Sequence, residues 1–377
     1  MSLYHHSSRD YDEAASDAAA RARDRMEGMI ERGTGRAKAL IGNIVEATPQ
    51  DFVVATGALG FGFDPEDGLR VSFDSHNLGL HRHARNQTVT RTGILTAKVA
   101  DSMVNAGPWG QQLLVDSLNR IYGNIDRERV LVRATGGEVR ALLSDRYRRM
   151  DSGPILEAFA GACGAVGAVP VESHATDTKW AIKCMLPMVF EPVPNEVLAY
   201  GIVLSNSDYG DGALSVRAFM LRLWCTNYAI RDECLRKVHL GGRLSEDVQF
   251  SDRTHRLDTE TMASAVKDIV GDTLSPDRVK RDMLLIEAAN EDGINAAEAI
   301  EALRKKNLLS KSEAAAVVEV YNTPDVEALP PGNTSWRLSN ALSLFAQDVG
   351  SGDEGRRLEI EQVAGRILDR FKPEAAN

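Results

Sequence analysis

Cysteine is scarce in this sequence, with 4 residues among 377. Their irregular spacing excludes the dense disulfide framework of small secreted domains, and free thiols are typical of a reducing compartment. The first ten residues also lack the apolar stretch of a secretory signal. We therefore expect a cytoplasmic protein.

Long apolar runs are also missing. The longest nearly uncharged stretch, residues 155–171, contains Glu157 and three glycines and is too short to span a bilayer comfortably. This excludes the usual membrane-spanning helix, and we expect no membrane partner. The same stretch instead favours a buried Ala/Gly helix that leads into a strand.

Positive charge is in deficit, with 44 Lys and Arg against 54 Asp and Glu, a formal net charge of −10. A protein whose whole surface is coated in nucleic acid is therefore excluded. Residues 258–377 hold 14 basic and 22 acidic residues, a net of −8, so most of the negative charge lies there. The content of 43% hydrophobic and 26% charged residues is that of an ordinary globular chain.

The N-terminal part of the chain alternates helical and strand-like patterns. Residues 11–32 favour a helix whose polarity all round indicates an exposed or partner-facing position. Short strands are expected at 51–55 and 69–73, and the glycines between 57 and 62 indicate a turn. A helical pattern over 87–122 is broken at Gly107-Pro108, because proline cannot continue a helix interior.

The centre of the chain is rich in predicted strands. A Gly136-Gly137 turn between two β-prone runs predicts a hairpin of residues 129–135 and 138–144. Further strands are expected at 169–173, 179–186, 196–204 and 213–224. We therefore predict an α+β fold, with a mostly antiparallel sheet and a packed helix at the centre and a helical C-terminal region. The predicted divisions are an N-terminal helical extension, an α+β core and the helical C-terminal region, at residues 1–45, 46–257 and 258–377.

Two stretches of the acidic chain are locally basic. Residues 120–150 hold eight arginines against four acidic residues, and residues 217–243 hold six basic against two acidic residues, a net of +4 in each. Arginine and lysine can contact phosphates while interleaved aromatic rings stack on bases. The predicted nucleic-acid-binding residues are Arg140, Arg146, Tyr147, Arg148, Arg149, Arg217, Arg222, Trp224, Arg236 and Lys237.

An alternative explanation of these basic stretches stays open. The arginines equally fit solvated strand faces and ion pairs with the acidic C-terminal region. Tyr147 and Trp224 equally fit a hydrophobic core.

No group of residues has a complete metal-ligand pattern. His81 and His83 would share one face of a strand but lack a third ligand, and Cys225, Cys234 and His239 lack the close cysteine spacing of a zinc knuckle. The oxygen-rich segment 206–211 could hold a divalent cation or form a turn. No nucleophile elbow or metalloprotease motif is present. The sequence therefore favours a protein without cofactor and without catalytic activity.

Several segments resemble the signatures of a phage- and plasmid-borne protein family that is defined by a domain of unknown function. The most specific are Ser144-Asp145-Arg146-Tyr147 and Ser205-Asn206-Ser207-Asp208, and the other resembling segments are Arg222–Asn227, Lys237–His239 and Thr334–Ala341. The likeness covers roughly residues 50–350. Asn227-Tyr228 departs from it, because the family often has Asn-Gly there. The resemblance implies a mobile-element gene in a bacterial host, often beside replication and recombination functions, and implies no catalytic residue.

Two functions follow as hypotheses. The first is a DNA-metabolism protein that binds or anneals single-stranded DNA and assembles into a homo-oligomer. The second is a phage-encoded protein-interaction or assembly factor without nucleic-acid affinity. The acidic C-terminal region and the polar N-terminal helix suit either hypothesis.

Overall fold

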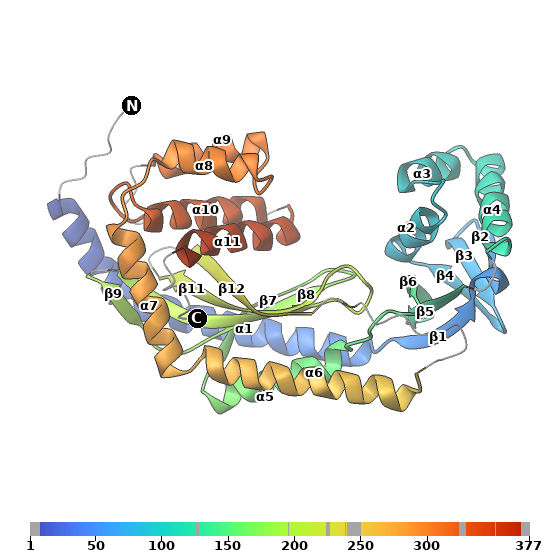
Figure 1. Cartoon of the computed structure of the whole chain (residues 1–377), viewed down its shortest axis with the longest axis horizontal. Helices are drawn as coiled ribbons and strands as arrows, with labels where there is room; N and C mark the ends of the chain where they lie inside the picture. Colours follow the sequence, from blue (N-terminus) through green and yellow to red (C-terminus); the bar gives the residue numbers. More distant parts are fainter. Residues whose placement is uncertain are drawn as a thin grey trace, which may run out of the picture.

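The computed structural model describes residues 8–125, 128–194, 196–223, 227–237, 239, 250–323, 329–350 and 352–370. The chain forms two lobes joined by a narrow waist (Figure 1). The first lobe contains residues 50–144, and the second lobe contains the N-terminal helix and residues 152–370. Each lobe has its own β-sheet. In the described part of the chain, no helix is long and apolar enough to cross a membrane.

The first lobe is a sheet covered on one side by three short helices. The sheet order is β1-β5-β6-β4-β3-β2, antiparallel except for the β4–β6 pair. The strands are β1 (Gln50–Ala55), β2 (Gly60–Asp64), β3 (Gly68–Phe73), β4 (His76–Leu80), β5 (Arg129–Thr135) and β6 (Glu138–Ser144), and the helices are α2 (Arg82–Arg91), α3 (Ala97–Asn105) and α4 (Pro108–Gly123). A short 3-10 helix, η1 (Thr56–Ala58), joins β1 to β2. Leu114, Leu118 and Tyr122 of α4 are fully buried against the sheet and form the core of this lobe.

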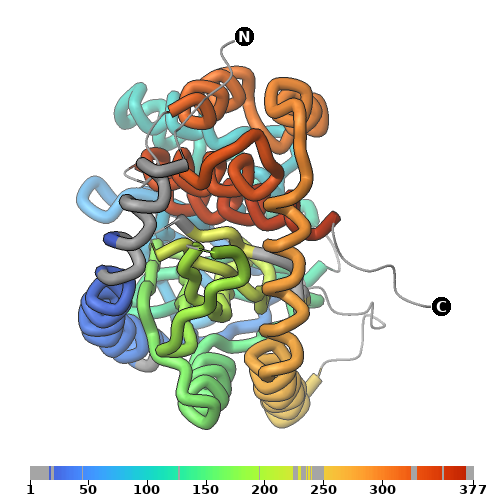
Figure 2. Tube along the Cα trace, turned by 90° about the vertical axis from the view of Figure 1, so that its left-hand side faces the viewer, coloured from blue at the N-terminus to red at the C-terminus, as the bar shows by residue number. Residues whose placement is uncertain are grey.

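The second lobe has three layers. Its antiparallel sheet has the order β12-β11-β10-β8-β7, and β9 pairs with β10. The strands are β7 (Val169–Ala175), β8 (Trp180–Met185), β9 (Phe190–Val193), β10 (Glu196–Asn206), β11 (Leu214–Arg222) and β12 (Asn227–Lys237). The helices α5 (Ser152–Ala165), α6 (Asp252–Thr273) and α7 (Pro276–Glu291) cover one face. Figure 2 shows this sheet between α5 and α6 below and the C-terminal helices above.

The C-terminal helices form a cluster on the other face of the second sheet. They are α8 (Ala296–Lys305), α9 (Lys311–Tyr321), α10 (Ser335–Gly350) and α11 (Glu354–Asp369). Buried apolar residues of all four helices make their own hydrophobic cluster. Both α10 and α11 contact β12, which lies at the edge of the sheet. The cluster therefore covers an edge strand that would otherwise present unpaired backbone groups.

The N-terminal helix corrects one expectation. It extends over Ser8–Glu46, and one side of it packs on β7 of its own chain instead of facing solvent or a partner. Ala22, Met26 and Met29 are buried in this contact. A Cβ on Gly33 would lie 2.3 Å from the Val171 Cα atom, so only glycine permits this close approach. The predicted helix ended near residue 32, whereas the apolar face of the helix continues through Ala37 and Leu40.

The α+β prediction is confirmed, and so are the hairpin of β5 and β6 and the helical C-terminal region. The strands divide between two sheets, because β5 pairs with β1 and β6 pairs with β4. The segment 57–62, expected to be a turn, contains the end of η1 and the start of β2. One hydrophobic cluster combines Leu40, Phe159 and Leu368, which come from all three predicted divisions of the chain.

Candidate functional site

The predicted cluster of Arg148 and Arg149 is engaged in ion pairs within the chain. The guanidinium of Arg148 pairs with the Asp258 carboxylate of α6, and this hydrogen bonding raises the pKa of Arg148. Arg149 lies 3.0 Å from Asp51 and 3.3 Å from Asp252, measured between nitrogen and oxygen atoms. These arginines therefore connect β1 and the first half of α6, and the Arg148 pair with Asp258 is of the kind that the ion-pair alternative expected.

Arg222 and Tyr147 are buried, which corrects their assignment to an exposed surface. Arg222 has no exposed side-chain area and donates from Nε and Nη2 to the Glu196 carboxylate at 2.8 and 3.1 Å. Tyr147 is 7% exposed, and burial raises the pKa of its hydroxyl. Arg222 is buried because β11 lies inside a sheet that is covered on both faces, and Tyr147 is buried because it packs in a small apolar cluster with Leu143 and Tyr209. Trp224 lies outside the described residues, as does the side chain of Arg236.

The other predicted residues lie at the surface to different degrees. Arg146 and Lys237 are exposed, whereas Arg217 is half-buried and donates to the Ser215 hydroxyl at 3.0 Å. Arg140 is half-buried, donates to the Asp177 carbonyl at 2.7 Å and lies 5.6 Å from the centre of the Tyr209 ring. The ten predicted residues therefore do not form one continuous exposed surface among the described side chains.

The two most specific sequence motifs meet at the waist between the lobes. The Tyr147 hydroxyl donates to the Ser207 carbonyl at 3.0 Å, and the Asn206 amide donates to the Met150 carbonyl at 3.0 Å. The His239 ring stacks on Tyr147 with 4.8 Å between ring centres and 7° between planes. A small apolar cluster that includes Tyr147 and Tyr209 fills the same contact. The two motifs, which are some 60 residues apart in the sequence, therefore contact each other and connect the lobes.

Arg133 lies at the centre of this waist. Its side chain is 1% exposed, and its Nε atom donates to Asp51 at 2.8 Å while Nη1 donates to the Asp208 carbonyl at 2.8 Å. Nη2 also pairs with the Asp151 carboxylate. Burial opposes the charged form, but the surrounding aspartates outweigh it and raise the pKa of Arg133. One guanidinium thus joins the first sheet to the start of α5 and to the loop between β10 and β11.

Asp208 is the unusual acid of this group. Burial raises the pKa of its carboxyl to about 6, against the attraction of Arg133. Its Oδ1 atom accepts a hydrogen bond from the Ser152 backbone N–H at 3.0 Å. At a pH between 3.8, the ordinary value, and 6, the folded chain holds a proton that the unfolded chain has released.

A pH dependence of stability follows from Asp208. Because the folded state binds the extra proton, the contribution of this group to stability rises as the pH falls from about 7 to about 4.5. In urea unfolding, we expect the natural chain to become more stable relative to the Asp208→Asn variant as the pH falls over this range. A difference between the two chains that is constant with pH would contradict the raised pKa. The exposed variant Asp116→Asn serves as the control, with no comparable trend.

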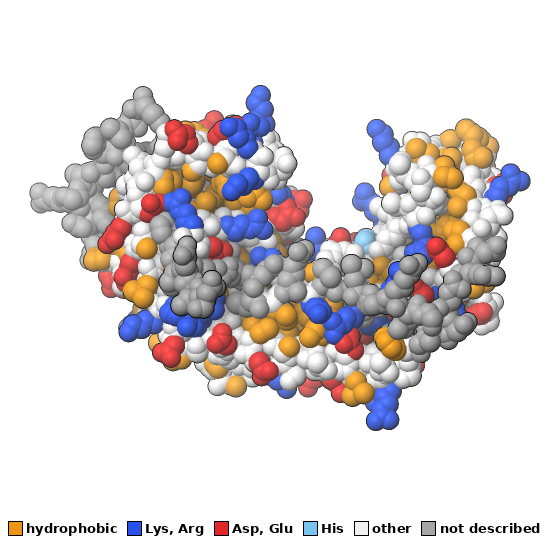
Figure 3. All heavy atoms as spheres, in the orientation of Figure 1, with side chains coloured by type: hydrophobic (Ala, Val, Ile, Leu, Met, Phe, Trp, Pro, Cys, Tyr) orange, Lys and Arg blue, Asp and Glu red, His pale blue; other side chains and the backbone are white. Residues whose placement is uncertain are grey.

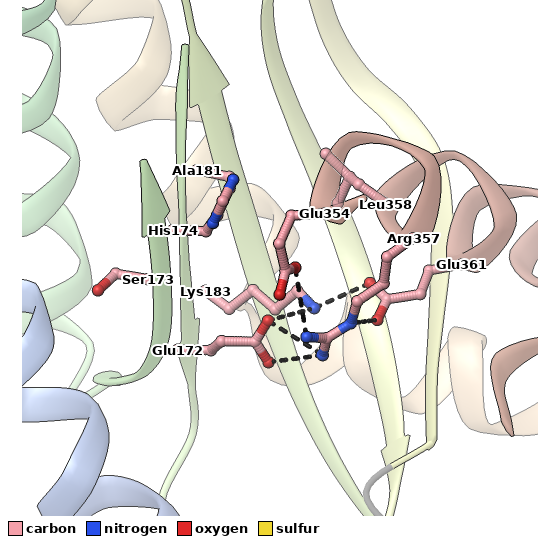
Figure 4. A pocket seen from close by; sticks show the side chains of 9 residues that line it. All are labelled: Glu172, Ser173, His174, Ala181, Lys183, Glu354, Arg357, Leu358 and Glu361. Atoms are coloured by element: carbon pink, nitrogen blue, oxygen red, sulfur yellow. Dashed lines mark hydrogen bonds and ion pairs between the residues drawn. The ribbon is translucent and has the colours of Figure 1, made fainter. Parts of the chain in front are cut away.

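A pocket on the second lobe holds a compact group of charged side chains between the sheet and α11 (Figure 4). The Lys183 Nζ atom lies 2.8 Å from Glu361 and 3.2 Å from Glu172. Arg357 also contacts both carboxylates, at 3.0 and 3.1 Å. Burial raises the pKa of Glu361, whereas the pKa of the half-buried Glu172 is lowered, because Lys183 and Arg357 outweigh its partial burial. These groups neutralise one another, so the cluster attaches α11 to the sheet rather than offering free charge to a ligand.

A hollow separates the two lobes on the face shown in Figure 3, with Lys and Arg side chains on both walls and some Asp and Glu side chains on one wall and on the floor. At the waist, the loop between β7 and β8 reaches the first lobe. His81 of the first lobe lies 3.5 Å from the carboxylate of Asp177 in this loop. The backbone carbonyl of Asp177 accepts the hydrogen bond from Arg140. Arg82, next to His81, is exposed, and Lys179 of the same loop is 42% exposed.

The candidate metal ligands are placed differently from the prediction. His81 precedes α2 as its N-terminal cap and His83 lies in the first turn, so the pair does not lie on a strand. Both ring nitrogens of His239 lie within hydrogen-bond distance of oxygens, those of Arg148 and Asn206. Cys225 and the side chain of Cys234 lie outside the described residues. Within the described ranges, no three His, Cys, Asp or Glu side chains come together as a metal site.

Comparison with known proteins returns no relative for this chain. No protein-family profile, no curated protein and no solved structure matches it.

Proposed function

We propose that this chain binds single-stranded nucleic acid in the hollow between its lobes, as a mobile-element DNA-metabolism protein that binds or anneals single strands. The observation that supports this proposal is the presence of basic side chains on both walls of the hollow (Figure 3). A flexible phosphate backbone can follow such a hollow and contact cations on either side.

Accessible charge distinguishes this surface from the clusters predicted by sequence. Arg82 and Lys179 come from different lobes and are both exposed, and Arg82 adjoins His81, which contacts the loop that carries Lys179. Arg140 lies beside them, against the Tyr209 ring. Lys179 also has a carboxylate nearby, that of Asp211 at 3.9 Å, but its side chain stays 42% exposed, whereas the ion-paired side chains of Arg148 and Arg222 are 20% and 0% exposed. A phosphate would have to displace the partners of these two arginines, which costs more than neutralising an exposed cation.

Fluorescence anisotropy of labelled single-stranded and duplex oligonucleotides tests the proposal. We expect a preference for single strands and a linear fall of log affinity with log salt concentration, because each neutralised phosphate releases counterions. The double variant Arg82→Glu/Lys179→Glu is expected to weaken binding and to reduce the magnitude of the salt slope by about 1.4, the value for two lost contacts to a single strand.

The matched control is Arg256→Glu/Lys267→Glu on α6, where both side chains are exposed. This variant changes the net charge equally but leaves the hollow intact, so its affinity and slope should match those of the natural chain. Equal weakening by both variants would refute binding in the hollow. Arg146→Ala tests the sequence-predicted cluster separately without breaking the ion pairs of Arg148 and Arg149.

A protein-interaction or assembly factor without nucleic-acid affinity is the second candidate. Exposed apolar side chains on the helices of the first lobe favour it, because such patches mark protein contacts. Absence of binding to either oligonucleotide would leave this candidate in place of the first.

A further inference from the structure

The first lobe carries an exposed apolar surface that its own core does not use. Trp109 and Ile94 are 68% and 76% exposed, and Val99 and Leu113 are also exposed. We call these four residues the apolar patch. Figure 3 shows apolar side chains gathered over α3 and α4, at the top of the first lobe. Tryptophan is rarely left this accessible in a monomer, and exposed patches of this kind mark contact surfaces.

Two residues of the patch, Trp109 and Leu113, lie on the outer side of α4. Trp109 and Leu113 are one turn apart, and Arg120 follows seven residues after Leu113, so these residues share one face of the helix. The opposite face of α4 carries Leu114 and Leu118, which are fully buried in the core of the lobe. The inner face alone therefore accounts for the packing of α4, and the outer face is available to a partner.

The surroundings of the patch are basic. Residues 82–125 contain five Lys and Arg against two Asp and Glu, although Arg85 and Arg91 pair with Asp101 and Glu128, whereas residues 258–377 have a net charge of −8. Lys98 and Arg120 are exposed, and neither has an ion-pair partner among the described residues. Asp116 is the acidic residue on the same face of α4, and it accepts a hydrogen bond from Gln112. The patch thus suits an acidic partner surface, and the helical C-terminal region of the same chain is acidic.

We infer that the apolar patch and its two cations dock onto the acidic helical region of residues 258–377, which includes α6 and α7, in a second copy of this chain. In a two-fold symmetric dimer, the apolar patches of the two copies would contact each other. Lys98 and Arg120 of one copy would then lie near the same residues of the other copy, and like-charge repulsion disfavours this arrangement. A contact between two different surfaces avoids this repulsion. Such a head-to-tail contact leaves one patch and one acidic surface free at the ends, so it builds rings or filaments instead of stopping at a dimer.

Mass photometry and sedimentation velocity of the full chain at increasing concentration test the inference. The natural chain is expected to form a ladder of species beyond the dimer, and the ladder should shorten at high salt. Trp109→Ser/Leu113→Ser is expected to weaken association by at least about 30-fold, the loss typical of a central aromatic anchor. Lys98→Glu/Arg120→Glu should weaken it too, because the surface becomes like-charged with its partner.

The control is Met188→Ser, which removes an exposed apolar side chain, 51% accessible, from the second lobe. It should assemble as the natural chain does, and circular dichroism confirms that each variant is folded. A monomer at every concentration, or a dimer that grows no further, would overturn the inference. Oligonucleotide anisotropy on the same samples keeps the two proposals separate, since the hollow residues Arg82 and Lys179 lie outside the patch.

Discussion

Replacing Arg222 with alanine is expected to lower the free energy of unfolding by about 3–5 kcal/mol, the usual cost of breaking a buried ion pair. The Glu196 carboxylate is 1% exposed, so without Arg222 its charge would stay in a nearly dry environment. Trp336 of α10 also donates to Glu196, at 3.3 Å, which ties this pair to the C-terminal helices. Urea unfolding followed by circular dichroism measures the loss.

The double variant Arg222→Met/Glu196→Met distinguishes charge burial from packing. Replacing both charged partners with apolar side chains of similar length removes the uncompensated charge, so most of the lost stability should return. Arg217→Ala on the same strand is the matched control, because Arg217 is only half-buried and is expected to cost less than about 1 kcal/mol. A loss below that value for Arg222→Ala would show that the buried pair does not stabilise the second sheet.

Replacing Arg133 with alanine is the second change with a large expected effect. Its guanidinium contacts Asp51, Asp151 and the Asp208 carbonyl, so its removal leaves neighbouring carboxylates without their shared cation. A loss of about 3–5 kcal/mol is expected, as for other broken buried ion pairs. Because these contacts cross the waist, we also expect the two lobes to open relative to each other more readily.

Hydrogen–deuterium exchange tests whether the two lobes open more readily in Arg133→Ala. Amides of the loop between β10 and β11 should exchange faster in Arg133→Ala, whereas those of β2 and β3, far from the waist, should change little. Arg129→Ala is the control, since Arg129 belongs to the same strand but is exposed. Uniformly faster exchange throughout the chain would indicate global destabilisation instead of a loosened waist.

Local sequence chemistry predicted several elements well. The Gly136-Gly137 pair has positive φ at both residues, 62° and 82°, which is the geometry that a tight hairpin requires. Proline at the first position of α4 follows Gly107, also with positive φ, exactly where the helical pattern breaks. Such positions are fixed by backbone sterics, so neighbouring residues suffice to identify them.

The candidate surface was less predictable. The sequence showed a local excess of arginine around residue 148, but Asp258 lies 110 residues away and neutralises that arginine only in the folded chain. Arg133 and Lys183 carried no signal that separates them from surface cations, because burial depends on which strands pair. The exposure of Trp109 could not be predicted from the sequence either, because tryptophan normally indicates a core position.

The sequence by itself determined the α+β class, the hairpin, the helix breaks and the separation of an acidic C-terminal region from locally basic stretches. These properties depend on short-range sterics and on composition. Only the tertiary structure decided that there are two sheets, that the Tyr147 and Ser207 motifs meet at the waist, and which cations stay accessible. Burial and ion pairing join residues far apart in the chain, so no local pattern encodes them.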